Sequence, residues 1–203
     1  RKGPTSYSLH LFGEPLANPK WERIVSLIRA AHPANAILLT TNGFFMNELN
    51  ARKLLELKVN RIFVSMHSLD EKTYRENTGS GDIAVVLRNV KTFLTLSRAK
   101  DKTKLFVRLF YPDAKVPETE KKRIMELRAQ GVLFEMRSYH NFAGAKQEWS
   151  AFDKAKRRWP CFHPWFTLGV SVEGKVTVCC ADASLGLYLG DAFTQSIEEI
   201  WKS

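Results

Sequence analysis

The stretch "SLHLFGEPLANP" (residues 8–19) shows the change from strand to helix that repeats along the chain. It opens as a strand-like run and breaks at Gly13, Glu14 and Pro15, because proline has no N–H to offer a neighbouring strand. A helical pattern follows over residues 19–32, with apolar side chains three and four positions apart. The stretch therefore predicts a strand, a turn that carries a carboxylate, and a helix.

The same alternation continues toward the C-terminus. Apolar runs of strand length occur at 6–12, 36–41, 61–67, 104–111 and 132–139, and helical patterns at 19–32, 47–58, 82–99 and 118–130. Strands that alternate with helices predict right-handed βαβ units and a parallel sheet, open or rolled into part of a barrel. The expected class of this part is α/β.

Polar residues unsuited to buried strands end each of the five runs. They are Gly13 and Glu14, then Thr41, Asn42 and Gly43, then Ser65 and His67, then Arg108, and last Tyr139, His140 and Asn141. Parallel α/β folds bind ligands at the carboxyl ends of their strands. Any single position could equally be a turn or cap residue, but five such ends together favour a binding face.

The pattern changes after Gly144. Residues 146–160 are polar and charged and predict a linker or a short helix. Residues 166–180 alternate in the manner of two strands joined through Glu173-Gly174, which predicts a hairpin because glycine accepts positive φ. A short irregular segment and a final helix from about Ser196 complete the expected order.

The three cysteines, Cys161, Cys179 and Cys180, all lie in this last part of the chain. An odd number of crowded cysteines is not a disulfide framework, and in a reducing compartment such thiols bind metal or are simply buried. With His163 they would also supply four ligands that zinc accepts.

Composition limits the function classes. The 203 residues are 44% hydrophobic, enough for a core, and contain neither an apolar run long enough for a membrane span nor a signal peptide, so we expect a cytoplasmic protein with no membrane partner. The net charge of +10 is spread along helices among acidic residues, which favours solvated helix faces over a nucleic-acid site. The non-Met start and uncapped final helix indicate an excerpt of a longer chain.

Several motifs together resemble the radical S-adenosylmethionine (SAM) enzymes. They are "FGEPL", "TTNG", "VSMHSLDEKTYRENTGSGDIAVVLRNV" and "YHNFAG", and the tail from Cys161 with its "LGD" step and closing Ile-Trp is similar to the SPASM auxiliary-cluster domain or its shorter twitch form. The resemblance implies strands 2 to 6 of a partial (β/α)6 TIM-like barrel over 1–145, a linker over 146–160, and a small α+β hairpin-helix domain over 161–203.

The resemblance also implies residue roles. Gly13, Glu14 and Pro15 would receive the methionyl group of SAM, with the carboxylate suited to its ammonium. Asn42 would belong to the same SAM site. Residues of the third and fourth predicted strands would bind the ribose and the carboxylate of SAM.

Ser65 and His67 would face the ribose of SAM, although many relatives have aspartate where His67 stands. Arg108 would bind the SAM carboxylate, because a guanidinium fork matches that group. Cys161 and Cys179, with Cys180 less well aimed, would hold an auxiliary 4Fe-4S cluster.

One family motif is missing from the printed chain. Radical SAM chemistry requires a CxxxCxxC loop for the site cluster, and none of the three cysteines forms one. By the family pattern the loop lies upstream of Arg1, so the 203 residues could not cleave SAM alone.

The resemblance implies a function in outline. Reductive cleavage of SAM would yield a 5'-deoxyadenosyl radical that abstracts a substrate hydrogen, and an auxiliary cluster would assist oxidation or maturation of a peptide, protein or amino-sugar substrate. Flavodoxin or ferredoxin would supply electrons. The alternatives from the residues themselves are a zinc-binding domain and a catalytically silent barrel that binds a nucleotide or anionic partner.

Overall fold

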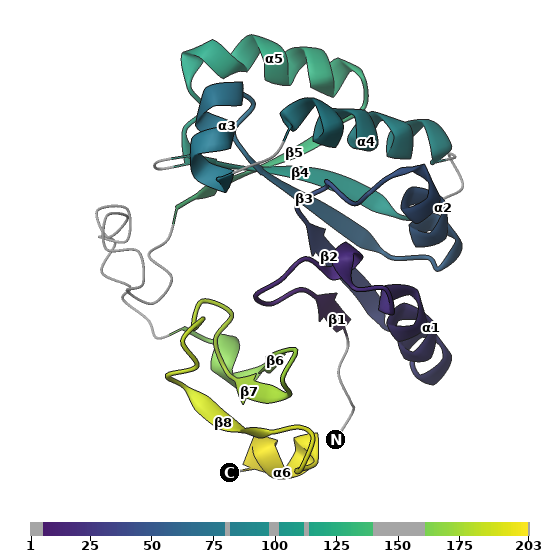
Figure 1. Cartoon of the computed structure of the whole chain (residues 1–203), viewed down its shortest axis with the longest axis vertical. Helices are drawn as coiled ribbons and strands as arrows, with labels where there is room; N and C mark the ends of the chain where they lie inside the picture. The colour runs from purple at the N-terminus through teal and green to yellow at the C-terminus, as the bar shows by residue number, and fades with distance from the viewer. Residues whose placement is uncertain (1–5, 80–81, 98–101, 112–113, 140–160, 203) are drawn as a thin grey trace. The chain divides into compact units, whose positions relative to one another are not determined.

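The computed structural model describes residues 6–79, 82–97, 102–111, 114–139 and 161–202 (Figure 1). The chain divides into two compact units. The first, called the sheet unit below, comprises Arg1–His10 and Glu14–Ser138, and the second, the hairpin unit, comprises Leu11–Gly13 and Tyr139–Ser203. The predicted linker at 146–160 lies outside the described residues.

The sheet unit is built on five parallel strands in the order β1-β2-β3-β4-β5. Their bounds are Ser6–Leu9, Ala36–Thr41, Arg61–His67, Lys104–Tyr111 and Leu133–Ser138. Spatial order follows chain order, and each strand pairs in parallel with the next, as in part of a barrel. The predicted α/β class is confirmed.

Helices cover one side of this sheet (Figure 1). They are η1 (Pro15–Ala17), α1 (Trp21–Ala31), α2 (Glu48–Glu56), α3 (Glu71–Thr78), α4 (Ile83–Leu96) and α5 (Glu118–Ala129). Side chains of Asn47, Asp70 and Asp82 cap α2, α3 and α4 by accepting backbone N–H groups. Helix α3 was not predicted, because Tyr74 is its only buried side chain and no apolar period marks it.

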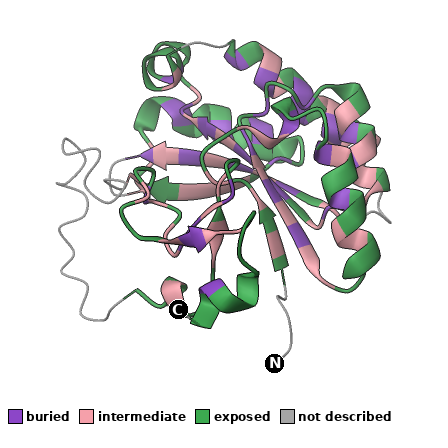
Figure 2. Ribbon diagram, turned by 60° about the horizontal axis from the view of Figure 1, so that its bottom comes forward, coloured by how far each residue is buried: buried purple, intermediate pink, exposed green. Residues whose placement is uncertain are grey.

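The hydrophobic core lies between the sheet and these helices. Alternate strand residues such as Ile37, Leu39, Ile62 and Leu109 are fully buried there, against helix residues that include Phe93. Figure 2 shows the buried positions gathered where helices meet strands. The opposite sheet face, called the inner face below, is lined by polar, charged and aromatic side chains instead. They include Ser8, His10, Thr40, Phe63, Arg108 and Glu135.

The hairpin unit is a three-stranded antiparallel sheet in the order β6-β7-β8. Its elements are η5 (His163–Trp165), β6 (Gly169–Val170), β7 (Lys175–Thr177), β8 (Tyr188–Asp191) and α6 (Ile197–Lys202). The predicted hairpin is confirmed, with Gly174 at φ +78° in its turn. The expectation of an irregular segment before the last helix was wrong where β8 forms.

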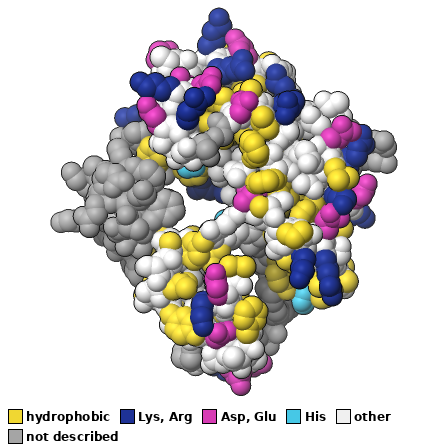
Figure 3. Space-filling model, in the orientation of Figure 1, with side chains coloured by type: hydrophobic (Ala, Val, Ile, Leu, Met, Phe, Trp, Pro, Cys, Tyr) yellow, Lys and Arg dark blue, Asp and Glu magenta, His cyan; other side chains and the backbone are white. Residues whose placement is uncertain are grey.

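Surface charges are mixed, as the sequence indicated. Basic and acidic side chains alternate over α3 and α5 in the view of Figure 3. No helix in the described part of the chain is long and apolar enough to cross a membrane.

Candidate functional site

The carboxylate of Glu14 joins the ends of the first two strands. Its Oε1 accepts hydrogen bonds from Leu16 N at 3.0 Å and Thr41 Oγ1 at 2.7 Å, and its Oε2 accepts one from Asn42 N at 2.6 Å. The sequence interpretation assigned Glu14 to a ligand and missed this internal role. Since a carboxylate has about four acceptor positions, one on Oε2 stays open to a ligand.

Pro15 and Gly13, the residues on either side of Glu14, suit their positions for different structural reasons. Pro15 opens η1 with its fixed φ, where no N–H is needed. A Cβ built on Gly13 would meet no atom within 4 Å, so the space beside that backbone is open.

The loop after β2 is held by close packing and by a buried amide. Gly43 has φ +78°, and a Cβ there would come within 2.7 Å of Val64 Cγ1. The Nδ2 group of Asn89 on α4 donates to the carbonyl oxygens of Gly43 and Phe44 at 2.9 and 3.0 Å. The only sequence signal for Asn89 was an amide within an apolar helix face.

His67 ends β3 in a strained conformation. The ladder with β4 shifts register between Ser65 and His67, and His67 has φ +59°. Its ring stacks on Phe110 with 5.0 Å between centroids, and its buried Nδ1 has no hydrogen-bond partner among the described residues. Burial lowers the pKa of His67, which favours the neutral imidazole. Strain together with an unpaired buried nitrogen is typical of a ligand site.

A buried carboxylate fixes the loop that follows His67. Glu120, in the first turn of α5, accepts hydrogen bonds from Ser68 Oγ at 2.8 Å, Leu69 N at 2.6 Å and Tyr111 Oη at 2.8 Å. In the sequence Glu120 looked like an ordinary acidic residue at a helix start. Its partners lie on other elements, so no local pattern could identify it.

Arg108 lies on the inner face and is already engaged. Its Nε donates to Glu135 Oε2 at 2.6 Å, and its guanidinium carbon lies 3.6 Å from the centroid of the Phe63 ring. Ser65 is its partner in the ladder, so these two predicted residues are brought together. The pKa of nearby His10 is lowered, first by burial and then by the positive charge of Arg108.

The hairpin unit carries the three thiols as free cysteines. Cys179 Sγ accepts a hydrogen bond from Ala181 N at 3.4 Å. Burial raises the pKa of Cys180, and the charges of Cys179 and Cys161 raise it further, so the thiols lie within electrostatic range of one another. Thiolates are the ligands that iron-sulfur clusters take, but the three thiols of the described hairpin unit are not gathered closely enough to hold a metal ion.

The structure does not form the zinc site considered from sequence. Among the described residues, no three His, Cys, Asp or Glu side chains gather so that they could hold a metal ion. The ring of His163 stacks on Phe162 instead, with 4.8 Å between centroids.

Two aspartates organise the loops around these cysteines. Asp182 accepts hydrogen bonds from Thr177 Oγ1 at 3.1 Å, Gly186 N at 2.9 Å and Leu187 N at 2.7 Å, and these bonds lower its pKa. Cys179 N donates to the same Thr177 hydroxyl at 3.3 Å. The loop that carries Cys179 is therefore fixed by polar contacts.

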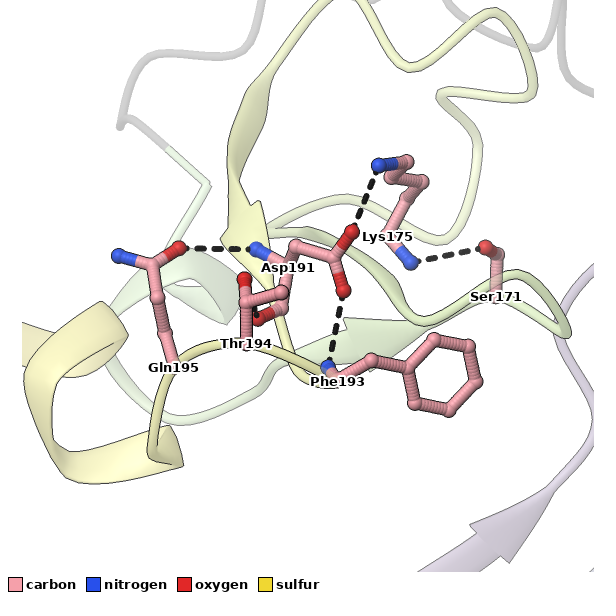
Figure 4. A network of polar contacts seen from close by, with 6 residues as sticks. All are labelled: Ser171, Lys175, Asp191, Phe193, Thr194 and Gln195. Atoms are coloured by element: carbon pink, nitrogen blue, oxygen red, sulfur yellow. Dashed lines mark hydrogen bonds and ion pairs between the residues drawn. The ribbon is translucent and has the colours of Figure 1, made fainter.

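Asp191 fixes the turn that follows β8 through polar contacts of the same kind (Figure 4). It binds Lys175 Nζ at 2.7 Å and accepts from Phe193 N at 2.8 Å, while its own N–H donates to Gln195 Oε1 at 3.0 Å. Asp191 is the aspartate of the "LGD" step.

Family comparisons agree with both units. Residues 1–106 match the model of the radical SAM superfamily. The chain belongs to this superfamily. Residues 161–203 match the SPASM iron-sulfur cluster-binding domain, which confirms the resemblance seen in the sequence. The two domains imply SAM and 4Fe-4S clusters as cofactors.

Curated relatives match the chain in part. The GTP 3',8-cyclase of Saccharophagus degradans is 33% identical over 90 residues, which are 44% of this chain and 27% of the relative. The GTP 3',8-cyclase of Lactiplantibacillus plantarum is 33% identical over 78 residues, 38% of this chain and 23% of the relative. The match thus spans about a quarter of these proteins.

Solved structures show the same fold at low identity. Streptococcus suis SuiB bound to its precursor peptide SuiA has a TM-score of 0.74 and 14% identity, with 98% of this chain and 54% of that chain covered. The protein anSMEcpe with bound AdoMet has a TM-score of 0.62 and 15% identity, covering 100% and 64%. BtrN in complex with AdoMet and 2-DOIA has a TM-score of 0.58 and 19% identity, covering 98% and 62%.

Proposed function

We propose that this chain is the greater part of an enzyme that cleaves SAM reductively to abstract a hydrogen atom from its substrate. The observation that carries the proposal is the Glu14 carboxylate, held between the ends of β1 and β2 with one acceptor position open. When bound, the clusters and SAM supply the electron transfer and the hydrogen abstraction. The protein supplies binding and orientation.

The chain's own residues would bind SAM along the strand ends. Glu14 would accept the methionyl ammonium, with Gly13 and Pro15 shaping the backbone around it. Asn42 would lie beside this group, because its N–H is already bound to Glu14 at 2.6 Å. These contacts would fix the methionyl end.

The other strand ends would complete the SAM site. Ser65 and the neutral imidazole of His67 would meet the ribose, and the unpaired Nδ1 of His67 supports that role. Arg108 would meet the carboxylate of SAM through nitrogens that Glu135 leaves free.

In the hairpin unit, Cys161, Cys179 and Cys180 would supply thiolates to an auxiliary 4Fe-4S cluster. The match of residues 161–203 to the SPASM iron-sulfur cluster-binding domain supports this assignment. We divide the chain into a barrel part at 1–145, a linker at 146–160 and the SPASM part at 161–203. The substrate would be a peptide, a protein or a small molecule, and flavodoxin or ferredoxin would be the electron donor.

The test uses the complete gene product, reconstituted anaerobically with iron and sulfide. We expect 5'-deoxyadenosine from SAM upon reduction with dithionite. Glu14→Gln should weaken SAM binding roughly tenfold to a hundredfold, the size of a lost charge-assisted hydrogen bond. The matched control, Glu48→Gln, changes an exposed carboxylate of α2 and should bind SAM normally. Full cluster occupancy without 5'-deoxyadenosine would instead favour a catalytically silent barrel.

A further inference from the structure

A short segment of the loop after β1 belongs to the hairpin unit. Leu11–Gly13 groups with Tyr139–Ser203, although His10 before the segment and Glu14 after it belong to the sheet unit. Peptide bonds therefore join the segment to the sheet unit at both ends. Any shift of the segment within the hairpin unit is passed along the backbone to Glu14, the residue that directly follows it.

A glycine of β6 receives the side chain of Leu11. A Cβ built on Gly169 would lie 3.1 Å from Leu11 Cδ1 and 3.3 Å from Leu11 Cδ2, closer than side chains normally pack. Gly169 is not among the glycines with positive φ, so its backbone conformation does not require glycine. The close approach of Leu11 explains the glycine at this strand position.

Gly169 lies on a strand pair that polar contacts already fix. It pairs with Thr177 across β6 and β7. Thr177 is fully buried, and its hydroxyl group donates to Asp182 at 3.1 Å and accepts from Cys179 N at 3.3 Å. Leu11 is therefore anchored on a part of the hairpin unit that has a defined position.

Glu14 has little freedom to absorb a shift of the segment. Its carboxylate oxygens accept from Leu16 N at 3.0 Å, Thr41 Oγ1 at 2.7 Å and Asn42 N at 2.6 Å. Hydrogen bonds weaken steeply when their angles depart from the preferred range. A displaced Gly13 backbone would therefore loosen these bonds and turn the open acceptor position of Glu14.

We propose that Leu11 and Gly169 are positioning residues for Glu14. Their contact sets the place of the Gly13 backbone and, through it, the orientation of the carboxylate. This gives the hairpin unit a second role beside that of its cysteines. The inference rests on the proposed function of Glu14 as the acceptor of the methionyl ammonium, but the contact itself can be tested without SAM.

The experiment uses the complete, reconstituted protein and a compensating pair of substitutions. Gly169→Val adds as many side-chain carbons beside Leu11 as Leu11→Ala removes, so the double variant restores the packed volume. Gly169→Ala is a milder test, because it adds only the Cβ. Gly186→Ala is the matched control in the same unit, since its Cβ would come no closer than 3.5 Å to Asp182 Oδ1, an ordinary contact.

Three quantities are measured for each variant. Calorimetry gives the dissociation constant of SAM. Hydrogen exchange without SAM follows the Asn42 amide, which donates to Glu14, and the Leu187 amide, which reports on the hairpin unit itself.

We expect Gly169→Val to weaken SAM binding about tenfold, because displacements of about 1 Å can reduce activity up to a hundredfold. Exchange at Asn42 should accelerate, while exchange at Leu187 stays unchanged. Gly169→Ala and Leu11→Ala should each have a smaller effect. The double variant should recover most of the SAM affinity, and the control should match the unchanged protein.

Three results would overturn the positioning role. Faster exchange at Leu187 with unchanged SAM binding and Asn42 exchange would show that the contact serves only the hairpin unit. Equal acceleration at Leu187 and Asn42 in both Gly169 variants would indicate general loosening instead. A double variant that binds SAM no better than Gly169→Val would show that contact with Leu11 is not the cause.

Failure of this inference and failure of the proposed function have different signatures. Normal SAM binding and unchanged Asn42 exchange in Gly169→Val, in a protein that forms 5'-deoxyadenosine, overturn the positioning role alone. Faster Asn42 exchange in Gly169→Val, in a protein that does not bind SAM at all, supports the positioning role and overturns the proposed function alone.

Discussion

The two units position their functional residues by different means. In the sheet unit a continuous apolar core, with Leu39 and Ile62 fully buried, holds the strands whose ends carry Glu14 and His67. In the hairpin unit only Val176 and Ile200 are buried apolar side chains among the described residues, and aspartates hold the loops. Packing thus positions the strand ends of the sheet unit, while polar contacts fix the loop that carries Cys179 in the hairpin unit.

The largest effect should come from opening the core of the sheet unit. Leu39→Ala removes a fully buried side chain, so we expect the free energy of unfolding to fall by about 2–5 kcal/mol. Leu27→Ala, at a side chain that is 59% exposed, is the control and should change it by no more than about 0.5 kcal/mol. Urea unfolding followed by hydrogen exchange would separate the units. Equal loss of protection from exchange in the hairpin unit would contradict the expectation that the two units lose stability separately.

Removing a polar contact should loosen the hairpin unit, as removing an apolar side chain should loosen the sheet unit. Asp182→Ala removes the acceptor for Gly186 N and Leu187 N, so exchange of these two amides should accelerate about tenfold. Asp182→Asn keeps one acceptor oxygen, so its amide exchange rates should lie between those of the unchanged protein and those of Asp182→Ala. Amides of the sheet unit serve as the internal control. Slow exchange at Gly186 in Asp182→Ala would show that apolar packing holds the loop after all.

The two units should also differ in their response to pH. The folded pKa values of His10 and His67 lie below the ordinary 6.5, so the stability that these two histidines contribute to the sheet unit is fully present above pH 6.5 and is lost as the pH falls below it. The pKa values of Asp182 and Asp191 are also lowered, so their contribution is present above about pH 3.8 and lost below. Hydrogen exchange measured from pH 7 down to pH 2 covers both transitions. A double His10→Gln, His67→Gln variant should flatten the upper step, and an unchanged step would refute this assignment.

The smallest effect should come from surface charge. Arg52 and Glu48 form an i,i+4 pair with side chains 55% and 60% exposed, so Arg52→Ala should lower the free energy of unfolding by about 0.5 kcal/mol or less. Thermal unfolding at low and high salt would check this value. A loss above 1 kcal/mol would mean that exposed charge pairs on the helices stabilise the sheet unit more than expected for a unit held by its apolar core.

Much of the fold was predictable because the strands are long apolar runs separated by helical periods. The exceptions have physical reasons. Helix α3 buries only Tyr74, and β8 is a short run that includes Gly190, so neither produced a clear period. Strand ends carrying Glu14 and Arg108 were also visible, because polar residues interrupt apolar runs there.

The partners of those site residues were not predictable. Glu135 meets Arg108 only because β4 and β5 pair in one register, and a shift of one residue would turn it away. Asn89 and Glu120 reach their loops from helices far along the chain. Such contacts follow from tertiary packing, which one sequence does not display.

The proposed auxiliary cluster is tested most directly by asking whether Cys161 and Cys179 of the hairpin unit bind iron that SAM cleavage does not need. We would measure iron and acid-labile sulfide per chain in the reconstituted complete protein and in a Cys161→Ala, Cys179→Ala variant. We predict that the variant loses about four iron atoms per chain and still forms 5'-deoxyadenosine from SAM. Unchanged iron content in the variant would contradict it.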